Sequence, residues 1–149
     1  MDKIRPWLYI GKYRDTLNTH LLSVYHIGAM LQLAELVEQP GITSLYLNVE
    51  DGVLLSHKLL RQGIDFVIAE KERGHTVFIS CGAGISRSAA FTTAALKEVE
   101  GLNLLDAFRV VKQGHPRAMP HPAIWESLCT YYREDVSFEI YSLNFDDTE

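Results

Sequence analysis

Alternating apolar and polar stretches divide this chain into strand-like and helix-like segments. A short run of β-branched and aromatic residues, from Thr76 to Ile79, is typical of a buried strand. The Glu-Gln-Pro-Gly turn signal at residues 38–41 precedes a second extended run, from Ile42 to Val49. Segments with apolar residues three or four positions apart follow these runs and indicate helices. Strands that alternate with helices predict an α/β fold, in which helices cover a central sheet.

Capping residues mark where three of these helices begin. Ser56 is expected to cap a helix that ends at Arg73-Gly74, and Asn103 a helix that ends at Gly114. Pro122 suits the first position of a last helix. The first helix has one row of Leu59, Gly63 and Phe66 and another of Leu60, Ile64 and Val67. The inward-facing rows are Leu104, Phe108 and Val111 in the second helix and Ile124, Leu128 and Tyr131 in the last.

Composition limits the number of domains and the kinds of partner. The 149 residues, 47% of them hydrophobic, suffice for one cored domain and are few for two, so we expect a single domain over residues 1–149. Residues 135–149 form an acidic and aromatic C-terminal tail, which can dock on the body or on a partner. The net charge of −5 argues against nonspecific binding to nucleic acid. No apolar stretch approaches membrane-spanning length, and residues 1–6 lack the apolar core of a signal peptide.

The segment after the strand run at residues 76–79 carries the strongest chemical signal. Cys81 follows the strand, a loop with two glycines comes next, and Arg87 opens a run of small residues typical of a closely packed helix. Backbone N–H groups in a strand-to-helix loop can point at one spot, where the helix dipole adds positive potential. That spot suits a phosphate dianion, and the same field favours a thiolate at Cys81. We therefore predict a phosphate-binding nucleophile loop.

The expected phosphate ligands are the backbone of the loop and the planar fork of Arg87. The loop residues are Gly82, Ala83, Gly84, Ile85 and Ser86. The second cysteine, Cys129, shares a helical row with Trp125 and Tyr132, which predicts a core or half-buried side chain. A free catalytic thiol fits reducing surroundings, so we expect a cytoplasmic location.

These residues resemble the Cys-x5-Arg loop of the protein tyrosine phosphatase superfamily, and residues 83–88 resemble its dual-specificity version. Residues 7–11 are similar to the opening strand of that family, residues 27–33 to its second strand, and residues 45–52 to the strand and loop that carry its general acid. The resemblance implies the cysteine-phosphatase fold, with a mostly parallel twisted sheet of about four to five strands. It also implies hydrolysis of phosphotyrosine, and in the dual-specificity branch of phosphoserine or phosphothreonine, in phosphorylated proteins.

The resemblance assigns the general acid to Asp51, which lies before Cys81 and is followed by Gly52. An acid is needed because an alkoxide or phenoxide leaves slowly unless a proton reaches it. Glu50 is the other candidate for the general acid. Alternatively, both carboxylates belong to a solvated turn without a catalytic role. Ser88 is implied to stabilise the thiolate and help it leave the phosphoenzyme, and a helix cap is its structural alternative.

Two positions depart from the family pattern. Ser80 stands where relatives have a histidine that orients the loop and tunes the thiol, so we expect a less acidic Cys81 than in those relatives. His121 stands where many relatives have an asparagine that braces the active-site loops. His121 can brace through a ring nitrogen or cap the last helix, and Pro122 favours the cap.

Other classes and groups fit less well. A pseudophosphatase that binds phosphorylated partners gains some support from Ser80, but Cys81, Arg87 and Asp51 are intact. A rhodanese-type sulfurtransferase needs neither Arg87 nor Asp51, and the low-molecular-weight phosphatases place the loop near the N-terminus. The six histidines show no metal-ligand spacing, so we expect no metal and no cofactor. Residues 12–14 are expected to be a solvated helix start rather than part of the active-site rim. The sequence leaves the oligomeric state open.

Overall fold

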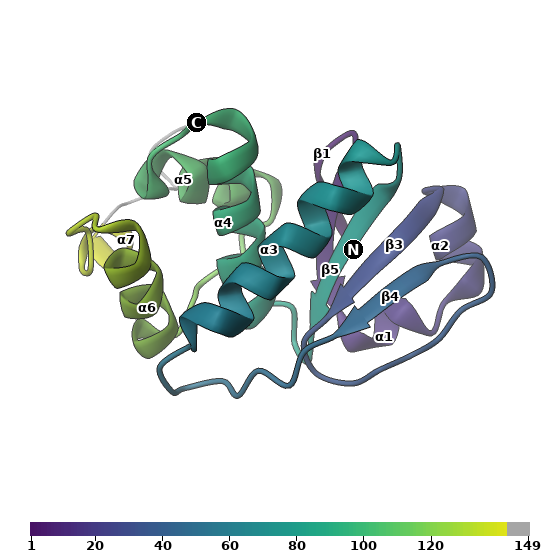
Figure 1. Ribbon diagram of the computed structural model, residues 1–149, viewed down its shortest axis with the longest axis horizontal. Helices are drawn as coiled ribbons and strands as arrows, with labels where there is room; N and C mark the ends of the chain where they lie inside the picture. The colour runs from purple at the N-terminus through teal and green to yellow at the C-terminus, as the bar shows by residue number, and fades with distance from the viewer. Residues whose placement is uncertain (143–149) are drawn as a thin grey trace.

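A computed structural model describes residues 1–142 and shows a five-stranded sheet between two layers of helices (Figure 1). The strands are β1 (Asp2–Arg5), β2 (Leu8–Lys12), β3 (Ile27–Gln32), β4 (Thr43–Tyr46) and β5 (Thr76–Cys81). The helices are α1 (Tyr13–Thr16), α2 (Thr19–Val24), α3 (His57–Glu72), α4 (Arg87–Glu100), α5 (Leu104–Gly114), α6 (Pro122–Tyr132) and α7 (Glu139–Ser142). The sheet order is β1-β2-β5-β3-β4, in which only the β1–β2 pair is antiparallel. The predicted α/β fold with a mostly parallel sheet is confirmed.

Strand β5 lies at the centre of the sheet, and its successive side chains enter two different cores. Val77 and Ile79 belong to the large core beneath α3 and α4, whereas Phe78 joins Tyr9 and Met30 in a smaller cluster on the opposite face. Both faces of β5 are therefore apolar, as expected of a parallel strand with helices on each side. Because β2 and β3 pair with β5, the end of β5 is held along both of its edges.

Helix α4 occupies the middle of the large core and contacts α3, α5, α6 and the sheet (Figure 1). Its side chains from Ser88 to Leu96 are all buried, and most of them are small, which lets neighbouring helices approach its backbone closely. This confirms the prediction of a closely packed helix after the loop. The first turn of α4 is consequently fixed against the end of β5, which sets the geometry of the loop between them.

The predicted helix caps at Ser56 and Asn103 are confirmed. Each side-chain oxygen accepts a hydrogen bond from the N–H of the third residue of its helix, as capping requires. Tyr131 is only half-buried, so the fully buried row of α6 is shorter than predicted and consists of Ile124 and Leu128. The strand expected over residues 42–49 is shorter, because β4 ends at Tyr46 and the chain leaves the sheet.

Several elements carry no clear signal in the sequence. Strand β1 and the short helices α2 and α7 were not predicted, whereas α1 begins within the expected helix start at residues 12–14. A helix of four to six residues is not stable alone, so contacts with the rest of the fold decide whether it forms. Of the predicted tail, the structure shows α7, whose Ile140 is buried, and residues 143–149 lie outside the described part.

Candidate active site

The predicted nucleophile lies at the carboxyl end of β5, where the chain turns into α4. Cys81 is the last residue of the strand and is 2% exposed. Its Sγ lies 3.2 Å from Oγ of Ser88, which is fully buried in the first turn of α4. The helix cap is Ser86, so the alternative of a capping role for Ser88 is wrong. The Ser88 hydroxyl is instead placed beside the sulfur atom, where it can donate a hydrogen bond to a thiolate.

Donors outside the loop hold its carbonyl groups. Three carbonyl oxygens accept such bonds: Gly82 from the Tyr13 N–H at 3.3 Å, Gly84 from His115 Nε2 at 2.6 Å, and Ile85 from the Met119 N–H at 2.9 Å. In a trans peptide the N–H points opposite to the C=O of the same unit. The N–H groups of Ala83, Ile85 and Ser86 therefore point away from these anchors, which is the arrangement that an anion-binding loop requires.

Arg87 bridges the loop to the ends of two other segments. One guanidinium nitrogen, Nη1, donates to the carbonyls of Leu33 and Val49, each at 3.0 Å. The other, Nη2, lies 3.1 Å from the place where a Cβ on Gly82 would stand. A side chain at Gly82 would therefore crowd the guanidinium. The structure brings Arg87 to the same loop as Cys81, as the spacing predicted.

The predicted general acid is bonded to the loop. Asp51 Oδ1 accepts a hydrogen bond of 2.7 Å from the Ser86 hydroxyl, and the Ser86 oxygen accepts one of 2.8 Å from the His121 N–H. Both Asp51 and Glu50 are exposed, but it is Asp51 that contacts Ser86. The loop carrying Asp51 runs along the lower edge of Figure 1, beside the junction of β5 and α4. The predicted acid thus lies against the loop that begins at the predicted nucleophile.

His121 both caps α6 and supports the site. Its Nδ1 accepts a hydrogen bond of 3.1 Å from the Ala123 N–H, which confirms the favoured cap. Its backbone N–H bonds Ser86, so the residue also braces the loops, through the main chain rather than a ring nitrogen. The far end of the Asp51 loop is anchored as well, because the Leu55 N–H donates to Ser127 Oγ of α6 at 2.8 Å.

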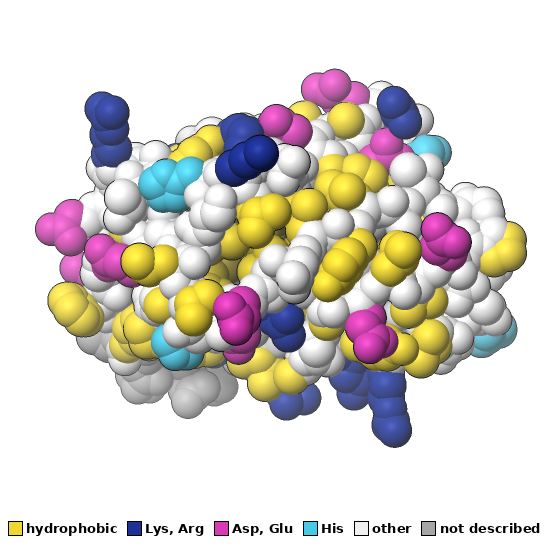
Figure 2. Space-filling view, turned by 60° about the horizontal axis from the view of Figure 1, so that its bottom comes forward, with side chains coloured by type: hydrophobic (Ala, Val, Ile, Leu, Met, Phe, Trp, Pro, Cys, Tyr) yellow, Lys and Arg dark blue, Asp and Glu magenta, His cyan; other side chains and the backbone are white. Residues whose placement is uncertain are grey.

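The residues beside the site include both charged and apolar side chains. Lys12 and Arg14 are exposed, as expected of a solvated helix start, while the Tyr13 side chain is half-buried. A side-chain hydrogen bond with Glu35 raises the pKa of Tyr13. On the Asp51 loop, Val53 and Leu54 are exposed apolar residues. Figure 2, in which the lower edge of Figure 1 comes forward, shows apolar side chains across the middle of the face with charged groups around and among them.

His115, which directly follows α5, was not singled out by the sequence analysis. Its ring contacts the carboxylate of Asp2 at 2.5 Å as well as the Gly84 carbonyl. These partners are 113 and 31 residues away along the chain. No local pattern could have indicated either contact.

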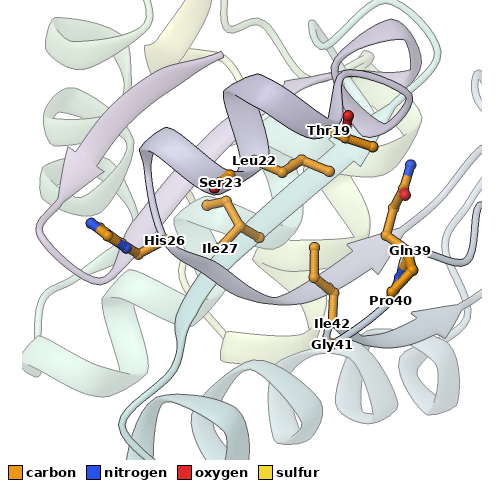
Figure 3. Close-up of a pocket in the computed structure, with 9 residues that line it drawn as sticks. All are labelled: Thr19, Leu22, Ser23, His26, Ile27, Gln39, Pro40, Gly41 and Ile42. Carbon is orange, nitrogen blue, oxygen red and sulfur yellow. The ribbon is translucent and has the colours of Figure 1, made fainter.

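Outside the candidate site, the described part of the chain holds a separate hollow but no cluster of metal ligands. Within residues 1–142, no three His, Cys, Asp or Glu side chains gather closely enough to hold a metal ion. Both cysteines are free. A hollow of about 550 Å³ lies between α2 and the segment before β4, and Figure 3 shows the residues that line it. Those residues include none of the candidate site. No helix in the described part of the chain is long and apolar enough to cross a bilayer.

Comparison with known proteins places this geometry in a family. The model of the family described as dual specificity phosphatase, catalytic domain, matches residues 8–134. Human dual specificity protein phosphatase 5 is 30% identical over 138 residues, which cover 89% of this chain but only 35% of that protein. The chain thus spans about a third of the length of that relative.

Solved structures share this fold. Human DUSP28 superimposes with a TM-score of 0.83 at 26% identity, covering 89% of this chain and 96% of that chain. A mouse putative dual specificity phosphatase complexed with zinc tungstate superimposes with a TM-score of 0.83 at 27% identity, covering 95% of this chain and 89% of that chain.

Proposed function

Because the chain belongs to the dual-specificity phosphatase family, we propose that it is a cysteine-dependent phosphomonoesterase acting on phosphorylated proteins. The observation that carries the proposal is the meeting of Cys81, Arg87 and Asp51 at one edge of the sheet, around a loop whose carbonyls are held on the outside. A nucleophile, a bidentate cation and an acid are the three groups that phosphoryl transfer to a protein side chain needs.

In the first step the Cys81 thiolate attacks the phosphorus atom. A sulfur–phosphorus bond forms while the bond from phosphorus to the leaving oxygen breaks. Arg87 and the loop N–H groups hold the three equatorial oxygens, where negative charge must be stabilised. Asp51 gives its proton to the leaving oxygen, and its bond to Ser86 keeps the carboxyl group over the loop.

In the second step water hydrolyses the cysteinyl phosphate. Asp51, now ionised, takes a proton from the attacking water as the sulfur–phosphorus bond breaks. The thiolate leaves with a hydrogen bond from Ser88, whose oxygen lies 3.2 Å from the sulfur. Inorganic phosphate is released, the two groups return to their starting states, and no metal or cofactor takes part.

The proposed substrates are phosphotyrosine and, at the same site, phosphoserine or phosphothreonine in proteins. The exposed Val53 and Leu54 beside Asp51 offer apolar contacts to residues that flank a phosphorylated side chain. The relative complexed with tungstate supports binding of a tetrahedral oxyanion by this fold. Two free thiols are compatible with a reducing compartment, and we place the enzyme in the cytoplasm.

Hydrolysis of phosphate esters by matched pairs of variants tests the proposal. Cys81→Ser should abolish turnover and keep oxyanion binding, whereas Cys129→Ser should leave turnover unchanged. Asp51→Asn should slow alkyl phosphates by about 10²–10⁴-fold and aryl phosphates with good leaving groups much less. Glu50→Gln is the control for Asp51 and should not change the ratio between the two substrates. The assays need a reductant and a chelator.

Two results would overturn the proposal. Turnover that survives in Cys81→Ser would show that Cys81 is not the nucleophile. Equal slowing of alkyl and aryl phosphates in Asp51→Asn would show that Asp51 is not the general acid. A folded wild type that binds tungstate without any turnover would instead identify a phosphate-recognising pseudophosphatase, for which the buried Ser80 before the nucleophile would be the first residue to restore to histidine.

A further inference from the structure

The buried ring of His115 lies between two hydrogen-bond acceptors. Its Nε2 is 2.6 Å from the carbonyl oxygen of Gly84, and its Nδ1 is 2.5 Å from a carboxylate oxygen of Asp2. The residue is only 8% exposed. A carbonyl can only accept a hydrogen bond, and so can an ionised carboxylate. To bond both partners, the ring must carry a hydrogen on each nitrogen, which makes it a positively charged imidazolium.

This ring acts on one peptide unit of the phosphate loop. The His115 bond draws the Gly84 carbonyl to the outside of the loop, so the Ile85 N–H of the same trans peptide points the opposite way. A charged donor makes a stronger bond than a neutral one, and it polarises the peptide so that the N–H at its other end becomes a better donor. The backbone of Gly84 has a φ of +70°, a conformation that glycine adopts readily. The His115 bond therefore opposes rotation of this peptide.

Other charged groups surround the same small hollow behind the loop. They are the Met1 amino group, Lys12, Asp15 and Arg117. Asp15 is already engaged, because it accepts a bond from the Lys12 N–H and pairs with the Met1 amino group at 3.2 Å. Asp2 is the carboxylate that contacts the ring, and 48% of its side chain is open to solvent. Among the groups around this hollow, Asp2 is the carboxylate paired with His115.

We propose that His115 is a cationic positioning residue for oxyanion binding: held by Asp2, its imidazolium keeps the Gly84–Ile85 peptide turned so that the Ile85 N–H faces the bound phosphoryl group. The role of the bound group as substrate rests on the proposed function. Loss of the ring charge weakens the grip on the Gly84 carbonyl and lowers the affinity of the loop for oxyanions. Anion affinity then depends on a residue that touches neither sulfur nor phosphate.

The test measures tungstate binding by calorimetry in a Cys81→Ser background, so that neither turnover nor titration of the nucleophile contributes. His115→Gln keeps a neutral donor and should weaken tungstate binding about tenfold or more, the usual effect of losing a charge-assisted bond. His115→Arg keeps a permanent charge and should bind within about twofold of the parent. His20→Gln, at an exposed histidine of α2, should not change the affinity.

The dependence on pH separates positioning by charge from simple packing. If the ring charge positions the loop, the affinity of the parent should fall as the pH is raised, whereas that of His115→Arg should stay level. Nitrogen NMR of the wild type at pH 6 should show hydrogens on both ring nitrogens of His115. If His115→Gln does not fold, Asp2→Asn, which leaves the Gly84 contact in place, should weaken binding at pH 8 more than at pH 6.

A neutral His115 ring at pH 6, or tungstate affinity that is the same in His115→Gln as in the parent, would overturn the proposal. So would a fall in affinity with pH that persists unchanged in His115→Arg. These outcomes differ from failure of the proposed function, which would show as absent turnover in a wild type whose tungstate affinity still depends on His115.

Discussion

Replacing Gly84 by alanine should damage the phosphate loop, and the same substitution at a second glycine provides a matched control. Gly84 has a φ of +70°, and a Cβ there would lie 2.8 Å from the backbone carbon and oxygen of Gly11. Gly101, at the end of α4, has nearly the same φ of +68°, but a Cβ there would meet no atom within 4 Å. The two substitutions share the same conformational penalty and differ in the contact with β2.

The expected costs follow from these distances. A left-handed backbone costs a residue with a Cβ about 1–2 kcal/mol, so Gly101→Ala should lower the free energy of unfolding by about that much. Gly84→Ala adds a contact shorter than real Cβ atoms tolerate, and overpacking of this kind costs about 1–3 kcal/mol more. If the loop shifts away from Gly11 instead, that added cost disappears and the N–H groups lose their alignment.

Urea unfolding and tungstate binding, measured together, distinguish these outcomes. Gly101→Ala should bind tungstate like the wild type. Gly84→Ala should either be about 1–3 kcal/mol less stable than Gly101→Ala or lose at least about tenfold in tungstate affinity, the size expected when one well-placed donor is lost. Equal stability of the two variants, together with wild-type tungstate affinity and turnover, would refute the reasoning.

Two further predictions concern stability away from the loop. A Cβ at Gly63 would stand 2.7 Å from Cδ1 of Phe91 and 3.3 Å from Leu31, so Gly63→Ala should cost about 1–3 kcal/mol in urea unfolding despite the better helix propensity of alanine. Arg5 donates two hydrogen bonds to Glu100, at 2.7 and 2.9 Å, and holds the pKa of Glu100 below its ordinary 4.5. The pair therefore stabilises the fold above the unfolded-state pKa and ceases to do so as the pH falls through the folded-state pKa. Glu100→Gln should be about 0.5–1 kcal/mol less stable at pH 7 and should match the wild type once the pH is below the folded-state pKa; a difference that persists in strong acid would contradict this.

The parts of the site that were predicted from the sequence are those whose partners are close along the chain. Cys81, its loop and Arg87 are contiguous, so the strand-to-helix geometry followed from the local pattern. The caps at Ser56, Asn103 and His121 accept hydrogen bonds from N–H groups two or three residues ahead, so they too could be predicted from the sequence. Asp51 was assigned by resemblance, and its contact with Ser86 across 35 residues is visible only in the structure.

Contacts between separate elements account for what the sequence did not show. Strand β1 exists because its backbone pairs with β2. A single short strand is not stable alone, so its own residues did not predict it. His115, between Asp2 and Gly84, connects the first strand to the phosphate loop across large separations along the chain.

The residues by themselves determined the fold class and the nucleophile loop, because alternation, capping and the cysteine–arginine spacing act over a few neighbouring positions. Only the tertiary structure decided which carbonyls are held outside that loop, by Tyr13, His115 and Met119. The direction of a backbone N–H depends on what the carbonyl of the same peptide bonds. In this protein, those partners are brought in by the folding of distant segments against the end of one central strand.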